Sequence, residues 1–329
     1  MTDKEIVTFG DFYAMQKNRD YSYQTIYDGE MFLSYPKTFN DPFDSMVLID
    51  KKEFEVEFLR RKYGENFITK EMCNFLFEGK SVFDRIKLVQ LNKSEKLPEE
   101  LKNLDCLKER KECNELFDAY FKQLQKVRNR YAVACFTINK PNSNMAMWAH
   151  YAENYNGFCC KFNFGNVIGA CSNQVYDKYA YHILKNLYKV KYLKKFAQLS
   201  AEKLLSVPLE EVYNNAYINK YVLGTMNKKY FQWKYENEYR LILDKEDSSI
   251  IKTLENDNGF RIKFDYLKEL YVSSDKLSLQ KELVIKEIAK KFKVKYLLLQ
   301  TSKGNVSLIE DENKLNKHNI DIDLKKLGF

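Results

Sequence analysis

The residues best suited to chemistry lie close together in the segment Trp233–Arg240, which reads W-K-Y-E-N-E-Y-R. In a strand, Glu236, Glu238 and Arg240 would point to one face, with successive same-face Cα atoms about 6.6 Å apart. Two carboxylates beside an arginine can divide labour, one stabilising developing positive charge and the other orienting or deprotonating an acceptor. The structural alternative is an exposed ladder of weak ion pairs. The neighbouring tryptophan and tyrosines favour a functional segment.

A second polar segment is the turn Asn40-Asp41-Pro42-Phe43-Asp44. Proline restricts the residue before it to an extended conformation, and Asn and Asp bond their own backbone in turns. Asp41 and Asp44 are therefore expected on a stiff turn as candidate site carboxylates. The structural alternative is that one of them caps the helix expected to begin near Lys51.

A third segment, Met147–Tyr151, reads M-W-A-H-Y and is expected on a short helix. Trp148, His150 and Tyr151 would line an aromatic pocket for a planar ring. In the structural alternative, Trp148 belongs to the core and a backbone carbonyl satisfies His150.

The surrounding pattern predicts an α+β fold with mixed or antiparallel sheets, because short apolar strands alternate with helical stretches. An α+β catalytic-like core is expected over residues 1–50 and 131–275, with a helical insertion at 51–130 and a C-terminal helix-strand extension at 276–329. The first fifty residues are expected to form short strands and turns. Further strands are expected at 131–137, 158–164, 188–192, 236–243, 260–264, 268–273 and 296–300, and helices at 141–155, 195–230 and 277–293.

Composition excludes several classes of site. The 329 residues include only 11 Gly and 3 His, and no glycine cluster suits a dinucleotide fingerprint or a phosphate-binding loop. The seven Cys residues include no C-x-x-C pair, which argues against a zinc ribbon and a disulfide framework. No apolar run approaches the roughly 18 residues of a membrane span, and no secretory segment opens the chain. A cytoplasmic protein with no membrane association is therefore expected.

The formal net charge is +8, and lysines concentrate at 185–195 and 286–295. These clusters are expected to be solvated lysine faces, with attraction of nucleic acid as the alternative.

Taken together, five motifs resemble those of a widespread bacterial family of proteins of unknown function. They are N-D-P-F-D at 40–44, C-F-T at 135–137, M-W-A-H-Y at 147–151, G-F-C at 157–159 and W-K-Y-E-N-E-Y-R at 233–240. The resemblance covers most of residues 20–245, interrupted by the 51–130 block. The order of the early strand, the aromatic motif and the late E-x-E segment is distantly similar to ADP-ribosyltransferases.

That similarity implies a fold of two packed β-sheets with helices, and an enzyme that cleaves the nicotinamide–ribose bond of NAD, its substrate, without a metal. It makes Glu238 the catalytic carboxylate and Glu236 the acceptor-orienting one. The remaining residues implied in NAD binding are Ser34, Tyr35, Asn40, Asp41, Trp148, His150, Tyr151, Trp233 and Arg240, with Arg19 or Tyr23 as the first contact. The implied role is a toxin or phage-defence effector that modifies a nucleic-acid or protein acceptor.

Two other functions remain open from the residues. In one, Asp41, Asp44, Glu236 and Glu238 hold Mg²⁺ in a nuclease or nucleic-acid-binding protein, with lysines binding phosphates. In the other, the chain is a non-catalytic defence sensor or interaction module.

Overall fold

The structure is a computed structural model that describes residues 11–64, 81–91, 99–163, 178–273, 278–302 and 305–310. Contacts divide the chain into two units. The sheet unit comprises Met1–Asp44, Tyr131–Tyr192 and Asn227–Phe329. The helical unit comprises Ser45–Arg130 and Leu193–Met226, so it consists of two separate insertions into the sheet unit.

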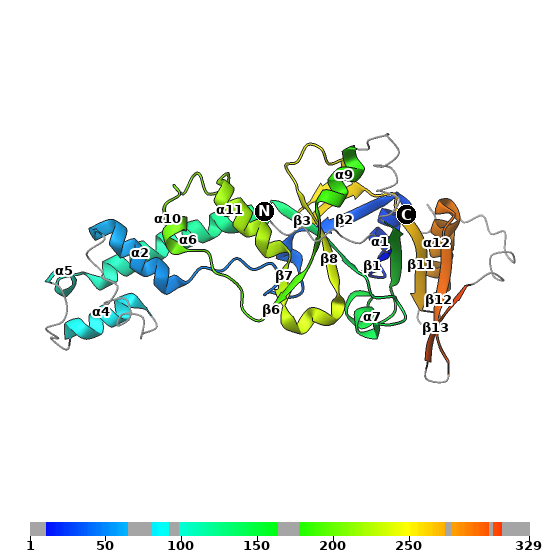
Figure 1. Ribbon diagram of the computed structural model, residues 1–329, viewed down its shortest axis with the longest axis horizontal. Coiled ribbons are helices and arrows are strands. Elements are labelled where there is room, and N and C mark those ends of the chain that lie inside the picture. The colour runs from blue at the N-terminus through cyan, green and yellow to red at the C-terminus, as the bar shows by residue number, and fades with distance from the viewer. Residues whose placement is uncertain are drawn as a thin grey trace. The chain divides into compact units, whose positions relative to one another are not determined.

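The predicted α+β class is confirmed (Figure 1). The strands are β1 (Asp11–Gln16), β2 (Glu30–Ser34), β3 (Tyr131–Thr137), β4 (Phe158–Asn163), β5 (Leu187–Lys189), β6 (Lys191–Leu193), β7 (Lys228–Tyr230), β8 (Glu238–Asp244), β9 (Lys252–Asn256), β10 (Gly259–Lys263), β11 (Leu267–Ser273), β12 (Lys295–Ser302) and β13 (Asn305–Glu310). The helices of the sheet unit are α1 (Asp20–Tyr27), α7 (Met145–Tyr151), α9 (Lys178–Lys185) and α12 (Leu279–Phe292), with 3-10 turns η1 (Pro36–Thr38) and η3 (Phe231–Glu236).

Strand β3 is the branch point of the large sheet. Along one edge it pairs with β8 over its full length, from Tyr131 opposite Asp244 to Thr137 opposite Glu238. Along the other edge it meets β1 at one residue pair and β2 at another. The strand order therefore forks at β3: β1 leads to β4, β11, β12 and β13, and β2 leads to β10 and β9. All pairings in this sheet are antiparallel except that of β11 with β12.

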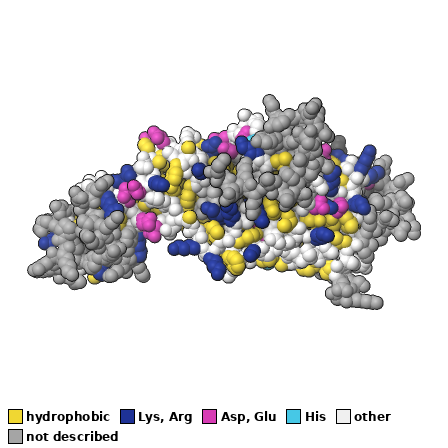
Figure 2. All heavy atoms as spheres, in the orientation of Figure 1, with side chains coloured by type: hydrophobic (Ala, Val, Ile, Leu, Met, Phe, Trp, Pro, Cys, Tyr) yellow, Lys and Arg dark blue, Asp and Glu magenta, His cyan; other side chains and the backbone are white. Residues whose placement is uncertain are grey.

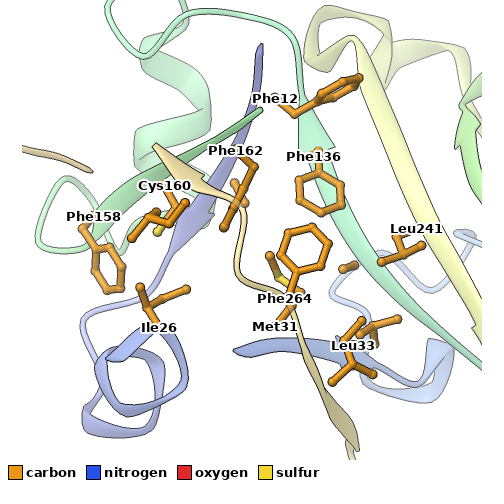
Figure 3. Close-up of a cluster of buried hydrophobic side chains, with 14 of the residues drawn as sticks. Phe12, Ile26, Met31, Leu33, Phe136, Phe158, Cys160, Phe162, Leu241 and Phe264 are labelled. Atoms are coloured by element: carbon orange, nitrogen blue, oxygen red, sulfur yellow. The ribbon is translucent and has the colours of Figure 1, made fainter. Parts of the chain in front are cut away.

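The core forms because apolar side chains alternate along these strands. In β4, Phe158, Cys160 and Phe162 enter one buried cluster, as the alternation predicts, while Lys161 lies on the opposite face. Figure 3 shows side chains from several strands and α1 converging on this cluster. Helices α1 and α12 contribute apolar side chains to it, and on the other side α7 packs Trp148 against a smaller cluster.

The helical unit contains α2 (Lys51–Tyr63), α4 (Val82–Leu91), α5 (Glu99–Lys102), α6 (Cys106–Arg128), α10 (Ala201–Leu205) and α11 (Ala216–Met226). Phe54 of α2 packs edge-on against Phe117 of α6, with ring centroids 5.1 Å apart. Residues Leu193–Met226, which the sequence pattern assigns to the core, cluster with this unit. One link is the Tyr120 hydroxyl, which donates to the Val207 carbonyl at 2.7 Å. Within the described residues, no helix is both long and apolar enough to cross a membrane.

Two expectations about local structure need correction, and a third is only partly covered by the described residues. Asp20–Tyr27 is a helix, where only strands and turns were expected near the start of the chain. The predicted strand at 236–243 begins at Glu238, and Glu236 ends a 3-10 turn. Of the expected extension at 276–329, the structure shows α12, β12 and β13, and residues 311–329 lie outside the described part.

Gly259 allows β10 to approach β2. Its φ is +156°, and a Cβ built there would lie 1.9 Å from the Leu33 carbonyl oxygen. We expect Gly259→Ala to lower the free energy of unfolding of the sheet unit by about 2–4 kcal/mol, through clash and backbone strain. Both tryptophans, Trp148 and Trp233, belong to this unit, so urea unfolding followed by tryptophan fluorescence measures it. Gly224→Ala in α11 of the helical unit, where a Cβ would meet nothing within 4 Å, is the control for a glycine-to-alanine change outside the sheet unit and should leave the midpoint of wild type unchanged. Equal midpoints for the two variants would contradict this packing.

Candidate active site

Asn237 shapes the E-N-E segment. It adopts the left-handed conformation, with φ 46° and ψ 50°, between the end of η3 and the start of β8. Asparagine tolerates this conformation better than most residues, and its Nδ2 donates to Asn139 Oδ1 at 2.9 Å. The Thr137 hydroxyl donates to the Glu236 carbonyl at 2.5 Å. Glu236 therefore lies in a 3-10 turn and Glu238 lies in a strand, rather than both lying in one strand.

Lys229 of β7 joins the two glutamates. Its Nζ lies 2.6 Å from Glu236 Oε2 and 3.0 Å from Glu238 Oε2. Asp44 Oδ2 lies 3.8 Å from the same nitrogen. The ammonium also lies 4.9 Å from the ring centroid of Trp233, within cation–π range. One buried lysine thus organises three carboxylates.

Arg240 completes the arrangement from β8. Its Nη1 and Nη2 donate to the two oxygens of Asp44 at 2.7 and 2.6 Å, and its Nε donates to Glu238 Oε1 at 2.7 Å. The Tyr151 hydroxyl donates to Glu236 Oε1 at 2.7 Å. We call Asp44, Lys229, Glu236, Glu238 and Arg240 the ionic cluster. Each member is at most 4% exposed.

The ionic cluster shifts the pKa values of the two glutamates in opposite directions. Burial disfavours ionisation of Glu238, but Arg240 and Lys229 outweigh it and lower its pKa to about 2. At Glu236, burial dominates over the opposing charge of Lys229 and raises the pKa. At Lys229, the charges of Glu238 and Glu236 overcome burial and raise the pKa. A pair of carboxylates pushed in opposite directions is the pattern of an acid–base pair with different roles.

The ionic cluster forms part of the wall of a cavity of about 510 Å³, a volume typical of small-molecule sites. Residues of β1, β2 and β3 line the cavity, so it lies where the sheet forks. Lys17 and Arg19 also line it and are exposed. Cys135 of β3 is exposed to the cavity. Loss of water around its thiol raises the pKa of that group, and the negative charge of Glu238 raises it further.

The structure brings most of the predicted site residues to this cavity. Those that line it are Ser34, Asn40, His150, Tyr151, Glu236, Glu238 and Arg240. Trp233 lies beside the cavity, and its ring centroid is 6.2 Å from the ring centroid of His150. Of the two candidates for a first NAD contact, Arg19 lines the cavity, whereas the buried Tyr23 donates its hydroxyl to Asn18 Oδ1.

Besides Trp233, three predicted site residues are absent from the cavity lining and have structural partners. The Trp148 indole is buried and donates Nε1–H to the Pro141 carbonyl at 2.7 Å. The Tyr35 hydroxyl donates to Glu255 at 2.8 Å. Asp41 accepts from the Phe43 amide at 2.9 Å, which stabilises the turn that delivers Asp44. The cap of α2 is Asp50, whose side chain accepts from two amides of the first turn.

The sequence pattern did not identify two residues of this site, Lys229 and Cys135. Lys229 is one of many lysines, and only its place seven residues before Glu236 could have drawn attention to it. Cys135 lies inside an apolar run and shows no polar pattern. Among the described residues, no group of three or more His, Cys, Asp or Glu side chains could hold a metal ion. The cluster carboxylates face Lys229 and Arg240 instead.

We expect Lys229→Met to lower the free energy of unfolding of the sheet unit by about 3–5 kcal/mol, because it leaves buried carboxylates without their cation. The neighbouring Lys228 is partly exposed, so Lys228→Met should change this value by no more than about 0.5 kcal/mol. Urea unfolding at pH 7 measures both. A loss below 1 kcal/mol for Lys229→Met would show that the lysine does not hold the cluster together.

Acid should remove the contribution of Glu238 to stability. Its folded pKa of about 2 lies below the ordinary value of 4.5, so the contribution is present above pH 4.5 and is lost as the pH falls toward 2. We expect the stability difference between wild type and Glu238→Gln to shrink by about 2 kcal/mol between pH 7 and pH 3. A difference that stays constant over this range would contradict the lowered pKa.

Comparison with known proteins identifies one matching family. Residues 147–241 match a family described as "Protein of unknown function (DUF2971)". No curated protein and no solved structure matches the chain. The matched segment runs from α7 into β8 and contains four of the five ionic-cluster residues, all except Asp44.

Proposed function

We propose that the protein is an NAD-consuming ADP-ribosyltransferase-like enzyme that cleaves the nicotinamide–ribose bond and transfers ADP-ribose to a macromolecular acceptor. The observation that carries the proposal is the pair Glu236 and Glu238, held by one lysine at a nucleotide-sized cavity with their pKa values shifted in opposite directions.

The charge distribution of the cavity suits NAD. With all members ionised, the ionic cluster carries three negative and two positive charges, which leaves 2 − 3 = −1. Lys17 and Arg19 add positive charge elsewhere on the cavity lining. A ligand with a cationic ring at one end and phosphates beyond it matches this polarity. NAD has a pyridinium ring and a pyrophosphate in that order.

The two glutamates would take different parts in the reaction. The C1′–N bond breaks, its electron pair neutralises the pyridinium, and nicotinamide leaves. Glu238, kept ionised by Arg240 and Lys229, stabilises the positive charge that develops on the ribose, as carboxylates do in glycoside cleavage. The acceptor nucleophile then bonds to C1′, and Glu236, whose raised pKa makes it the better proton acceptor, takes the released proton.

The fold is compatible with this assignment. The fork at β3 divides the large sheet into diverging branches, and the cavity lies at their junction. The role of a toxin or phage-defence effector is part of the proposal and is supported by the motif resemblance.

Nicotinamide release from NAD tests the proposed activity. We expect the purified protein to release nicotinamide, measured by chromatography, with nucleic-acid and protein acceptors supplied in turn. Glu238→Gln should reduce the rate about 100-fold or more. Tyr151→Phe, which removes only a hydroxyl, should slow transfer to the acceptor more than it slows nicotinamide release, because its hydroxyl contacts Glu236 alone of the two glutamates.

Glu282→Gln is the control, because Glu282 pairs with Lys286 on α12 and does not line the cavity. Each variant's unfolding curve should accompany its rate. No release with any acceptor, or equal release by wild type and a folded Glu238→Gln, would refute the activity and favour a non-catalytic role.

A further inference from the structure

Three segments of the sheet unit near the ionic cluster contain no acidic residue. Residues 131–152, 187–192 and 227–235 include no Asp or Glu, and the acids that follow the third segment are the buried Glu236 and Glu238. Their lysines are Lys140, Lys189, Lys191, Lys228, Lys229 and Lys234. In a chain with 46 acidic residues, this distribution concentrates positive charge around one site.

These segments adjoin one another in the fold. Asn139 Nδ2 donates to the Tyr235 carbonyl at 2.7 Å, and Asn144 Nδ2 donates to the same oxygen at 3.0 Å. Strand β6 pairs with β7, and the Val190 amide donates to the Glu238 carbonyl at 2.9 Å. The loop after β3, strand β6 and the β7–η3 segment therefore border the ionic cluster together.

Aromatic rings are exposed among these lysines. Tyr230, Phe231 and Tyr235 are 39%, 43% and 40% exposed. The Lys234 ammonium lies 5.6 Å from the ring centroid of Phe231. Figure 2 shows hydrophobic and basic side chains intermixed at the lower edge of the molecule, below the position of β6 and β7 in Figure 1. We define the lysine–aromatic surface as Lys140, Lys191, Tyr230, Phe231, Lys234 and Tyr235.

The lysine–aromatic surface is continuous with the cavity. Phe231, Trp233 and Tyr235 all belong to η3, and this turn ends at Glu236. Trp233 contacts both Lys229 and the ring of His150, which lines the cavity. A ligand bound along η3 would therefore lie next to the proposed reaction centre.

We propose that this surface binds single-stranded nucleic acid and presents it as the acceptor. Charge complementarity favours a polyanion, because the surface supplies ammonium groups and its segments expose no carboxylate. The exposed rings favour unpaired bases, which stack on aromatic side chains at about 1–3 kcal/mol each, over a duplex whose bases are already stacked. The role as acceptor rests on the proposed function, whereas the binding itself requires no NAD.

Fluorescence polarisation with a labelled single-stranded oligonucleotide, in DNA and RNA versions, tests the proposal without NAD. Three lysine–phosphate contacts predict an affinity that falls about 20-fold between 50 and 200 mM salt. The double variant Phe231→Ala/Tyr235→Ala should weaken binding about 30-fold or more. The triple variant Lys140→Gln/Lys191→Gln/Lys234→Gln should remove most of the salt dependence.

The helical unit provides a matched control. Tyr217 is 41% exposed, and the Lys203 ammonium lies 5.0 Å from its ring centroid. Tyr217→Ala/Lys203→Gln removes the same kinds of group and should change the affinity less than twofold. Glu282→Gln, on α12 and away from the cavity lining, should bind the oligonucleotide as wild type does.

The outcomes separate this inference from the proposed activity. Binding with the expected variant pattern but no NAD cleavage would support the surface and refute the activity. No binding at 50 mM salt, equal affinity for a duplex, or no effect of the aromatic double variant would each overturn the inference. ADP-ribosylation of protein by a chain that binds no oligonucleotide would overturn it while leaving the activity intact.

Discussion

The structure of the candidate site depends on burying two cations and three carboxylates in one cluster. Charges of this kind are tolerated in a protein interior only when each has partners in good geometry. Lys229 meets that requirement by contacting Glu236 and Glu238, and Arg240 meets it by clamping Asp44 and Glu238. The turn after β2, strand β7, turn η3 and strand β8 must therefore come together in one arrangement, because a displaced element would leave an uncompensated buried charge.

The same constraint gives the cluster its chemical asymmetry. Glu238 contacts both cations, whereas Glu236 contacts one cation and a tyrosine hydroxyl, so the first remains ionised and the second accepts protons more readily. Because β3 joins two diverging strand branches, the cluster borders a cavity rather than a packed interface. Stability and the proposed chemistry thus draw on the same contacts.

Much of the scaffold followed from sequence, because strand periodicity is a local property. The strands expected at 158–164 and 131–137 correspond to β4 and β3. The E-x-E-x-R pattern located three cluster members, but for a partly incorrect reason. A left-handed Asn237 places Glu236 in a 3-10 turn, and local strand spacing cannot reveal that. Lys229 escaped notice because its partners, not its type, distinguish it from other lysines. Trp148 is the opposite case. Its type and position predicted a pocket residue, but its side chain is buried in the smaller apolar cluster.

In the proposed function, Glu238 and Glu236 face the reacting end of NAD in the cavity at the fork. A crystal structure of Glu238→Gln soaked with NAD tests this placement, since the variant removes the charge proposed to act in the reaction and retains the shape of the side chain. We expect nicotinamide and its ribose beside residues 236 and 238, with the pyrophosphate toward Lys17 and Arg19. NAD bound with adenine at the cluster, or bound elsewhere while the cavity holds only solvent, would contradict it.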